Sequence, residues 1–447
     1  MPKLQIPQKY TLILFALLSF IPFSSKAYSV LTHEAVIDAS WAKSILPLLK
    51  EKYPMAKDSD LHVAHAYAYG GCLMPDMGYF PFGSEYFTDL AHYVRTGDFV
   101  ENLLSEAENL DEYAFALGAL CHYMADTYGH SIATNHVVPV VYPKMGEKFG
   151  PVVTYDEDHI SHSRVEISFD VLEIARGNYA SQNYHDFIGF EVSKPVLERA
   201  FIKTYGQDIN SVFGDLDLAI GSFRWAVRSL LPTLTRTAWI LKKNDIKKLN
   251  PSMNSHTFHY RMERKAYYKE FGSSRQKPKL KEYLLSVFLR IVPKIGPFKA
   301  LKFKPVGPEG EKLFVRSFDT VLVRYSEQLT KLHTGKIHLD DVNYDTGNLT
   351  TPGEYGLTDK TYVELLGKLD GNKFVDLTKP LQQNLLEYYS KADTSQFALK
   401  YKGDWKKASV ALQDLKAAAP IKMDSLKNIK GIYYKFNEPA TPAAKSK

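Results

Sequence analysis

The amino-acid sequence predicts an all-α protein. Apolar residues recur at helical spacing through most segments, whereas the alternation that is typical of strands is scarce. Of the 447 residues, 45% are hydrophobic and 24% are charged, which is the composition of an ordinary globular protein with a sizeable core. The length suits two domains, or one large domain with extensions.

Residues 1–27 have the three-part pattern of a secretory signal. Lysines precede the apolar run Thr11–Phe23, which is too short to span a bilayer comfortably. Ser25 and Ala27 then supply small residues at positions −3 and −1 of a cleavage site. We expect this segment to be removed and the secreted or periplasmic protein to begin at Tyr28. An uncleaved anchor or a lipid-tethered form is the alternative, although no Cys lies near the site to carry a lipid.

Capping residues and periodicity predict the helices in order. Thr32 is expected to cap a helix over residues 32–53, and an Asp-Ser cap opens the next helix at Asp58. That second helix is expected to stop at Gly70-Gly71, because glycines commonly end helices. Further helices are predicted over residues 111–127, 161–175, 193–205, 217–231, 377–390 and 404–417.

Breaks rich in Pro, Gly and Lys divide the chain. We expect a first helical domain over residues 28–240 and a basic, mainly helical C-terminal region of unknown role over residues 241–435. The tail over residues 436–447 is predicted to be disordered.

Charge is distributed unevenly between these parts. Residues 28–170 hold 8 Lys and Arg against 21 Asp and Glu, whereas residues 241–310 hold 17 against 5. An acidic region suits cation binding, and a basic one suits anionic surfaces. In residues 242–304 lysines alternate with Phe, Leu and Ile, which suits peripheral contact with an anionic membrane. A solvated basic helix is the alternative.

Histidines are concentrated in the acidic part, where nine of the 14 fall between His33 and His162. His122, Asp126 and His130 follow one another at intervals of four, so each lies only about 40° around a helix from the last. Two imidazoles and a carboxylate therefore lie on one face of the predicted helix. A second pair, His162 and Glu166, repeats the spacing, which makes a purely structural Asp–His hydrogen bond a weaker explanation.

The donor types indicate the metal. Nitrogen and oxygen donors without thiolate suit zinc, with manganese or iron as alternatives. Asp76 follows a Gly-Gly stop and a Pro, which places a carboxylate on a loop at a helix end; a turn-forming Asp is the alternative. His92 is predicted to be helical. His33 would be the sixth residue of a mature chain whose free α-amino group at Tyr28 could also chelate.

Together these residues give the chain a family resemblance. From Tyr28 to about Asp170 it resembles the zinc-dependent phospholipases C, which include alpha-toxin, and more distantly the single-strand-specific zinc nucleases. Those enzymes are all-α and bind three zinc ions through an ordered set that ends in an HxxxD pair, a His and an HxxxE pair. The matching residues, in chain order, are Tyr28, His33, Asp76, His92, His122, Asp126, His130, His162 and Glu166.

The resemblance implies a phosphodiesterase with up to three zinc ions, which hydrolyses phospholipid to diacylglycerol and a phosphorylated headgroup through a zinc-bound hydroxide. Asp76 would double as general base. The implied ligands of one zinc are Asp76, His92, His122 and Asp126. Those of the second are His130, His162 and Glu166, and those of the third are Tyr28 backbone groups, His33 and Asp126.

Three positions depart from the family pattern. Tyr28 stands where the family usually has Trp, which backbone ligation tolerates. His130 follows the HxxxD pair more closely than in the bacterial phospholipases, which leaves His136 as a competitor. His159 lies close to His162, but only His162 has Glu at the fourth following position.

Two other function classes remain open. A secreted zinc nuclease would use the same metals, and nucleic acid is expected as a partner only under that alternative. Its bases would need aromatic platforms, for which Tyr79, Phe80, Phe82 and Tyr86 are available. A non-catalytic, zinc-stabilised scaffold is the third class. Cys72 and Cys121 are either a disulfide or two buried thiols.

Overall fold

The computed structural model describes residues 30–80, 82–176, 190–225, 303–391 and 402–421, with a few single residues between 243 and 251. The predicted signal segment, Tyr28, the disordered tail and almost all of the basic segment 242–304 lie outside the described residues.

The prediction of an all-α protein is confirmed. Within the described ranges, the β-pairing that the structure contains is limited to two isolated bridges, Val342 with Leu349 and Thr378 with Ile421. The helices of the N-terminal part are α2 (Val30–Ser40), η1 (Trp41–Ile45), α3 (Leu46–Lys52), α4 (Asp58–Leu73), η2 (Met74–Tyr79), α5 (Glu85–Tyr93), α6 (Thr96–Glu106), α7 (Leu110–Gly129), η3 (His130–Thr134), α8 (Asn135–Val141), α9 (Pro143–Phe149), α10 (His159–Arg176), α11 (Lys194–Tyr205), α12 (Ile209–Phe213) and α13 (Leu216–Trp225). Those of the C-terminal part are α17 (Gly307–His333), α18 (Gly356–Gly371), α19 (Lys379–Ser390) and α21 (Lys402–Ala417).

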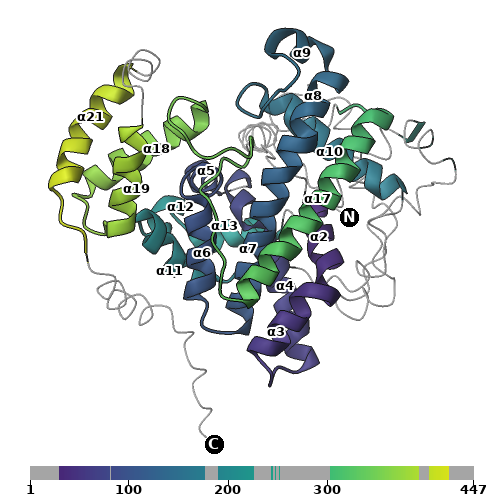
Figure 1. The fold of residues 1–447 in the computed structure, drawn as a ribbon, viewed down its shortest axis with the longest axis horizontal. Helices are drawn as coiled ribbons and strands as arrows, with labels where there is room; N and C mark the ends of the chain where they lie inside the picture. The colour runs from purple at the N-terminus through teal and green to yellow at the C-terminus, as the bar shows by residue number, and fades with distance from the viewer. Residues whose placement is uncertain are drawn as a thin grey trace, which may run out of the picture.

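Helix α7 runs through the middle of the bundle, with α2, α4, α6 and α17 packed around it (Figure 1). Nearly all of its residues are buried, because its sequence is apolar on every face except at a few positions. A helix buried all round leaves its polar side chains to find partners inside the protein.

Helices α4 and α7 approach each other more closely than side chains would permit. A Cβ at Gly71 would lie 1.9 Å from the carbonyl oxygen of Phe115, and a Cβ at Gly118 would lie 2.1 Å from the carbonyl oxygen of Ala68. The glycines therefore allow backbone to pack on backbone. The predicted helix stop at Gly70-Gly71 is wrong, since α4 continues to Leu73 and uses both glycines for packing.

The C-terminal end of α7 continues without a break through η3 into α8. The segment η3 is a π-helical turn that begins at His130, directly after Gly129, the last residue of α7. A π turn bonds residues five apart and so inserts one extra residue into the helical path. Residue Asn135, five positions beyond His130, is thereby carried to the same side of the helix.

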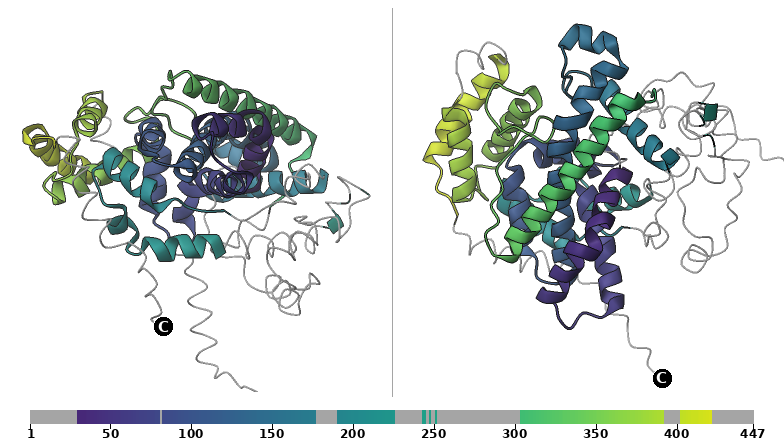
Figure 2. Two further views of the ribbon diagram at one scale, coloured as in Figure 1. Left: turned by 90° about the horizontal axis from the view of Figure 1, so that it is seen from below. Right: turned by 45° about the vertical axis from the view of Figure 1, so that its right-hand side comes forward.

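The C-terminal part shares its core with the N-terminal part. Helix α17 packs alongside α7, and α18, α19 and α21 lie together on one side (Figures 1 and 2). The hydroxyl of Tyr325 in α17 donates a 2.9 Å hydrogen bond to the carbonyl of Leu117 in α7. Residues of both parts belong to one continuous apolar cluster. The predicted boundary near residue 240 lies outside the described residues and stays a prediction.

Residues 334–355, which we call the 334–355 loop, connect α17 to α18 and run along α5, α6 and α7 (Figure 1). The Tyr344 amide donates to the carbonyl of His92 at 3.1 Å. The hydroxyl of Thr96 donates to the carbonyl of Val342 at 2.8 Å. This loop is therefore tied to the elements that supply the histidines.

Several local predictions need correction. Thr32 lies inside α2 rather than at its cap, where its hydroxyl donates to Asp170 Oδ1 at 2.9 Å. Asp76 lies on the 3₁₀-helix η2 and not on an open loop. Helices α17 and α18 were not predicted. Cys72 and Cys121 are free, buried thiols, so the disulfide alternative is wrong.

None of the helices in the described residues combines the length and the apolarity that a membrane crossing requires.

The close approach of α4 and α7 leads to a stability prediction. We expect Gly118→Ala to lower the free energy of unfolding by roughly 3 kcal/mol, because the new methyl group would overlap the α4 backbone. Chemical denaturation of the purified variant measures this. Gly367→Ala in α18 is the matched control, since a Cβ there meets nothing within 4 Å, and it should be neutral or stabilising by up to about 1 kcal/mol. Equal stability of the two variants would contradict the packing described.

Candidate metal centre

Eight of the predicted ligands fall within the described residues, and the structure buries all of them. They are delivered by separate helices, namely His33 by α2, Asp76 by η2, His92 by α5, His122 and Asp126 by α7, His130 by η3, and His162 and Glu166 by α10. Their donor atoms form three groups in which all atoms lie within 4.8 Å of one another, and these groups are His33, His122 and Asp126; Asp76, His92 and His122; and His130, His162 and Glu166.

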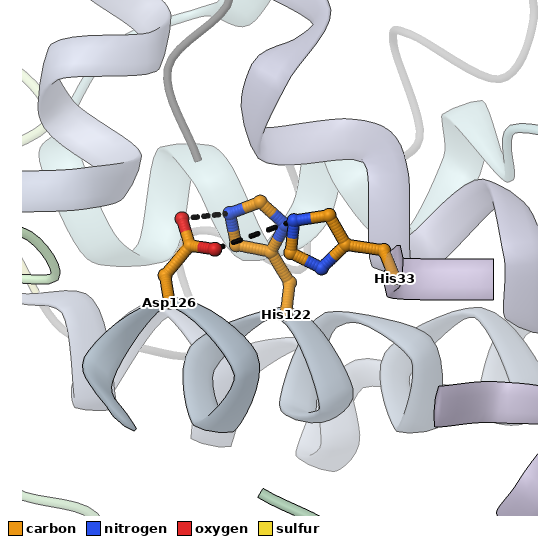
Figure 3. A group of neighbouring side chains, drawn as sticks. All are labelled: His33, His122 and Asp126. Carbon is orange, nitrogen blue, oxygen red and sulfur yellow. Dashed lines mark ion pairs between the residues drawn. The ribbon is translucent and has the colours of Figure 1, made fainter. Parts of the chain in front are cut away.

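Asp126 links the first two groups. Its Oδ2 lies 3.0 Å from Nε2 of His122 and 3.4 Å from Nε2 of His92, and its Oδ1 lies 3.3 Å from Nε2 of His33. Figure 3 shows His33 reaching across from α2 toward the α7 pair, with its ring stacked on that of His122 at a centroid distance of 4.5 Å. Asp76 Oδ1 lies 3.4 Å from Nε2 of His92.

Two of these imidazoles are held by main-chain carbonyls. Nδ1 of His122 donates to the carbonyl of Cys72 at 2.8 Å, and Nδ1 of His92 donates to that of Thr88 at 2.8 Å. Since a carbonyl only accepts, Nδ1 carries the hydrogen and each neutral ring presents a lone pair on Nε2. These Nε2 atoms face each other at 3.4 Å beside the Asp126 carboxylate. Such a convergence of lone pairs requires a cation, and rings fixed through the other nitrogen are typical of metal ligands.

The third group is built in the same way. Nδ1 of His162 lies 2.8 Å from Glu166 Oε1, and Nε2 of His130 lies 3.6 Å from the same oxygen. The remaining nitrogens are anchored, since Nε2 of His162 lies 3.0 Å from Asn135 Oδ1 and Nδ1 of His130 lies 3.1 Å from Asp345 Oδ1.

The pKa shifts of Asp126 and His92 show that the carboxylates and imidazoles of the cluster stabilise each other's charged forms. Burial opposes ionisation of Asp126, but His122 and His130 outweigh it and hold the pKa of that carboxyl well below its usual range. Burial also lowers the pKa of His92, yet Asp126 and Asp76 overcome this and raise it to about 10. His33, beside His122, has a lowered pKa because burial dominates. In the absence of a metal ion, a proton therefore occupies the cluster.

The donor set fits a zinc ion. Asp76 Oδ1, both oxygens of Asp126 and Nε2 of His130 make no hydrogen bond of ordinary geometry although they are buried. Buried polar atoms in native proteins are nearly always paired, so atoms aimed at a common point without hydrogen bonds suit coordination. Nitrogen and carboxylate oxygen in groups of three match the zinc preference. The nearby thiol of Cys121 is fully buried, which raises its pKa well above the usual range, and no sulfur enters the groups.

The competing histidines lie elsewhere. His136 and His159 are exposed, whereas His130 and His162 are completely buried within the third group. Tyr28, the predicted N-terminal ligand, lies outside the described residues.

Two polar residues that contact the histidines of the third group were missed by the sequence analysis. Asp345 is separated from His130 by 215 residues, so no local spacing connects them. Asn135 lies on the continuous helix just beyond His130, and the π turn that orients it has no signature in the periodicity of the sequence.

The raised pKa of His92 predicts a pH dependence. Because it lies above the ordinary 6.5, its proton stabilises the metal-free fold fully below pH 6.5, and this stabilisation is lost as the pH rises through about 10. Zinc must displace that proton, so we expect zinc affinity to rise about tenfold per pH unit between pH 6 and 8 for each proton released. Calorimetric titration of the metal-free chain in buffers of different ionisation enthalpy measures it. A zinc affinity independent of pH would contradict the assignment.

The comparisons with known proteins agree with this geometry. Residues 32–215 match the family model described as zinc dependent phospholipase C. Searches of curated proteins and of solved structures found no match. The matched segment contains every described residue of the three donor groups. Over residues 32–215, which are less than half of its 447 residues, this chain is therefore similar to the zinc-dependent phospholipase C family.

Proposed function

We propose that this protein is a secreted, zinc-dependent phosphodiesterase of phospholipase C type that hydrolyses phospholipid to diacylglycerol and a phosphorylated headgroup. The observation that carries the proposal is the convergence of three buried donor groups within the segment that matches the family. The anchored imidazoles of His92, His122, His130 and His162 add support for metal binding, because a histidine that binds a metal ion usually has its other ring nitrogen held by a polar partner.

We propose the following ligands for up to three zinc ions. The first ion would be held by Asp76, His92, His122 and Asp126. The second would be held by His130, His162 and Glu166. The third would be held by His33 and Asp126 together with backbone groups of Tyr28. When bound, closely spaced zinc ions lower the pKa of a water molecule to about 7 and neutralise charge on phosphoryl oxygens.

Asp76 is our candidate for the general base. Its side chain keeps 8% exposure, whereas those of His92 and Asp126 are completely buried. We therefore propose that substrate and water approach the cluster from the side of η2, where its least buried donor side chain lies. There the Asp76 carboxylate would take one proton from the attacking water as the bond between phosphorus and the water oxygen forms and the bond to the diacylglycerol oxygen breaks. The departing diacylglycerol oxygen would take up one proton from a second water molecule, so that diacylglycerol leaves as an alcohol.

The remaining parts of the chain complete the proposal. Cleavage after residue 27 would free the Tyr28 amine, so that export and assembly of the third site are coupled. Residues 28–240 would carry the donors. Peripheral contact of residues 242–304 with an anionic membrane would bring the enzyme to its substrate. Together these proposals place a secreted or periplasmic enzyme at a lipid surface.

The ligand assignment predicts the metal content of variants. His162→Gln should lose about one zinc ion per chain, because it removes one of three donors from a single group. His159→Gln is the matched control, since it makes the same change three residues earlier at an exposed position of α10. Elemental analysis of the purified mature proteins gives both numbers. An unchanged content in the His162 variant would exclude that ligand.

The catalytic proposal predicts which substrate is cleaved. The mature protein should release phosphocholine from phosphatidylcholine vesicles, and Asp76→Asn should slow this about 10²- to 10⁴-fold. Asp58→Asn, at a side chain that is 99% exposed, should keep full activity.

A parallel assay on single-stranded DNA separates the alternatives. Nucleotide release would favour the nuclease class, for which the 63% exposed ring of Phe82 near η2 offers a stacking surface. Inactivity on both substrates with zinc bound would favour a scaffold.

A further inference from the structure

The 334–355 loop reaches the metal centre from outside the segment that matches the family. The ring of Tyr344 packs on those of His92 and His122, with centroids 5.3 Å and 5.8 Å away. The next residue, Asp345, is completely buried. A buried carboxylate is costly unless it is paired, so its partners identify what the loop is anchored to.

The carboxylate of Asp345 has three partners. Its Oδ1 lies 3.1 Å from Nδ1 of His130. Its Oδ2 accepts from the hydroxyl of Tyr93 at 2.9 Å and from that of Tyr355. The pairing with His130 places the ring hydrogen on Nδ1 and leaves Nε2 facing Glu166.

The main chain of Asp345 acts on the second histidine of the same group. Its carbonyl accepts a 2.6 Å hydrogen bond from the side-chain amide nitrogen of Asn135. The amide oxygen of Asn135 is thereby turned toward Nε2 of His162, 3.0 Å away. Nδ1 of His162 is then the nitrogen that faces Glu166, at 2.8 Å. One residue therefore orients both imidazoles.

We propose that Asp345 is a positioning residue for the group formed by His130, His162 and Glu166, through which the C-terminal part of the chain completes the zinc centre. This inference rests on the proposed function. A carboxylate behind an imidazole raises its basicity and fixes its tautomer, and loss of such a partner commonly weakens metal binding by 10- to 100-fold.

Asp345→Asn in the full mature chain tests the proposal. The substitution preserves the shape of the side chain and the carbonyl that holds Asn135, and removes the charge that faces His130. We expect the zinc affinity of the site formed by His130, His162 and Glu166 to fall about 10- to 100-fold, as measured by competition with a chelating dye. In the His162→Gln background, where this group is already disrupted, Asp345→Asn should have little further effect on the zinc that remains.

Asp359→Asn is the matched control. Asp359 is equally buried in the C-terminal part, and its carboxylate accepts a 2.7 Å hydrogen bond from the hydroxyl of Tyr388 and a 2.8 Å bond from the amide of Gly353. Both variants should lower the melting temperature of the metal-free chain, because both perturb a buried network. Only the Asp345 variant should lower zinc affinity.

The outcomes are distinguishable. If the wild-type chain binds zinc and Asp345→Asn binds it equally well, the proposal is overturned while the proposed function stands. A wild-type chain that binds no divalent ion overturns both. If Asp345→Asn does not fold, Tyr93→Phe removes one hydrogen bond from the same carboxylate and should weaken zinc binding about two- to tenfold. Unchanged affinity in that variant would also overturn the proposal.

Discussion

A carboxylate buried in the middle of an apolar helix is the constraint on which this structure depends. Asp126 is completely enclosed by the bundle. Moving an ionised carboxylate out of water costs several kcal/mol unless cationic partners replace the solvent. The elements around α7 supply those partners, since α2 and α5 each bring a histidine to it, and α4 ends where its carbonyl at Cys72 holds His122. The packing of these helices around α7 therefore also brings the donor side chains together.

The sequence predicted the donor contacts between residues that are close together along the chain. The pairs His122 with Asp126 and His162 with Glu166 are spaced four residues apart, and helical geometry alone puts each pair on one face. The ordered set of donor residues then resembled a family, and residues 32–215 match the model of that family. The resemblance and the individual candidate donors were therefore available from the sequence, whereas their assembly into three groups is seen only in the folded chain.

The sequence did not predict features that arise from distant contacts. Asp345 meets His130 across 215 residues, and only the folded chain brings them together. The glycines of α4 were interpreted as a helix stop, because glycine serves both as a terminator and as a site of close packing, and local sequence does not distinguish the two. The π turn at His130 depends on tertiary packing in the same way.

Because the N-terminal and C-terminal parts share one core, there is a limit to how short a fragment can be and still hold the three donor groups in place. A fragment that stopped at the end of the matched segment would contain every donor atom of the three groups. It would lack the carboxylate behind His130, the carbonyl that turns Asn135, and the helix whose Tyr325 is bonded to α7. The motif defines which donor atoms face one another, whereas the hydrogen bonds made by Tyr325 and Asp345 define how much of the chain must be kept to hold those atoms in place.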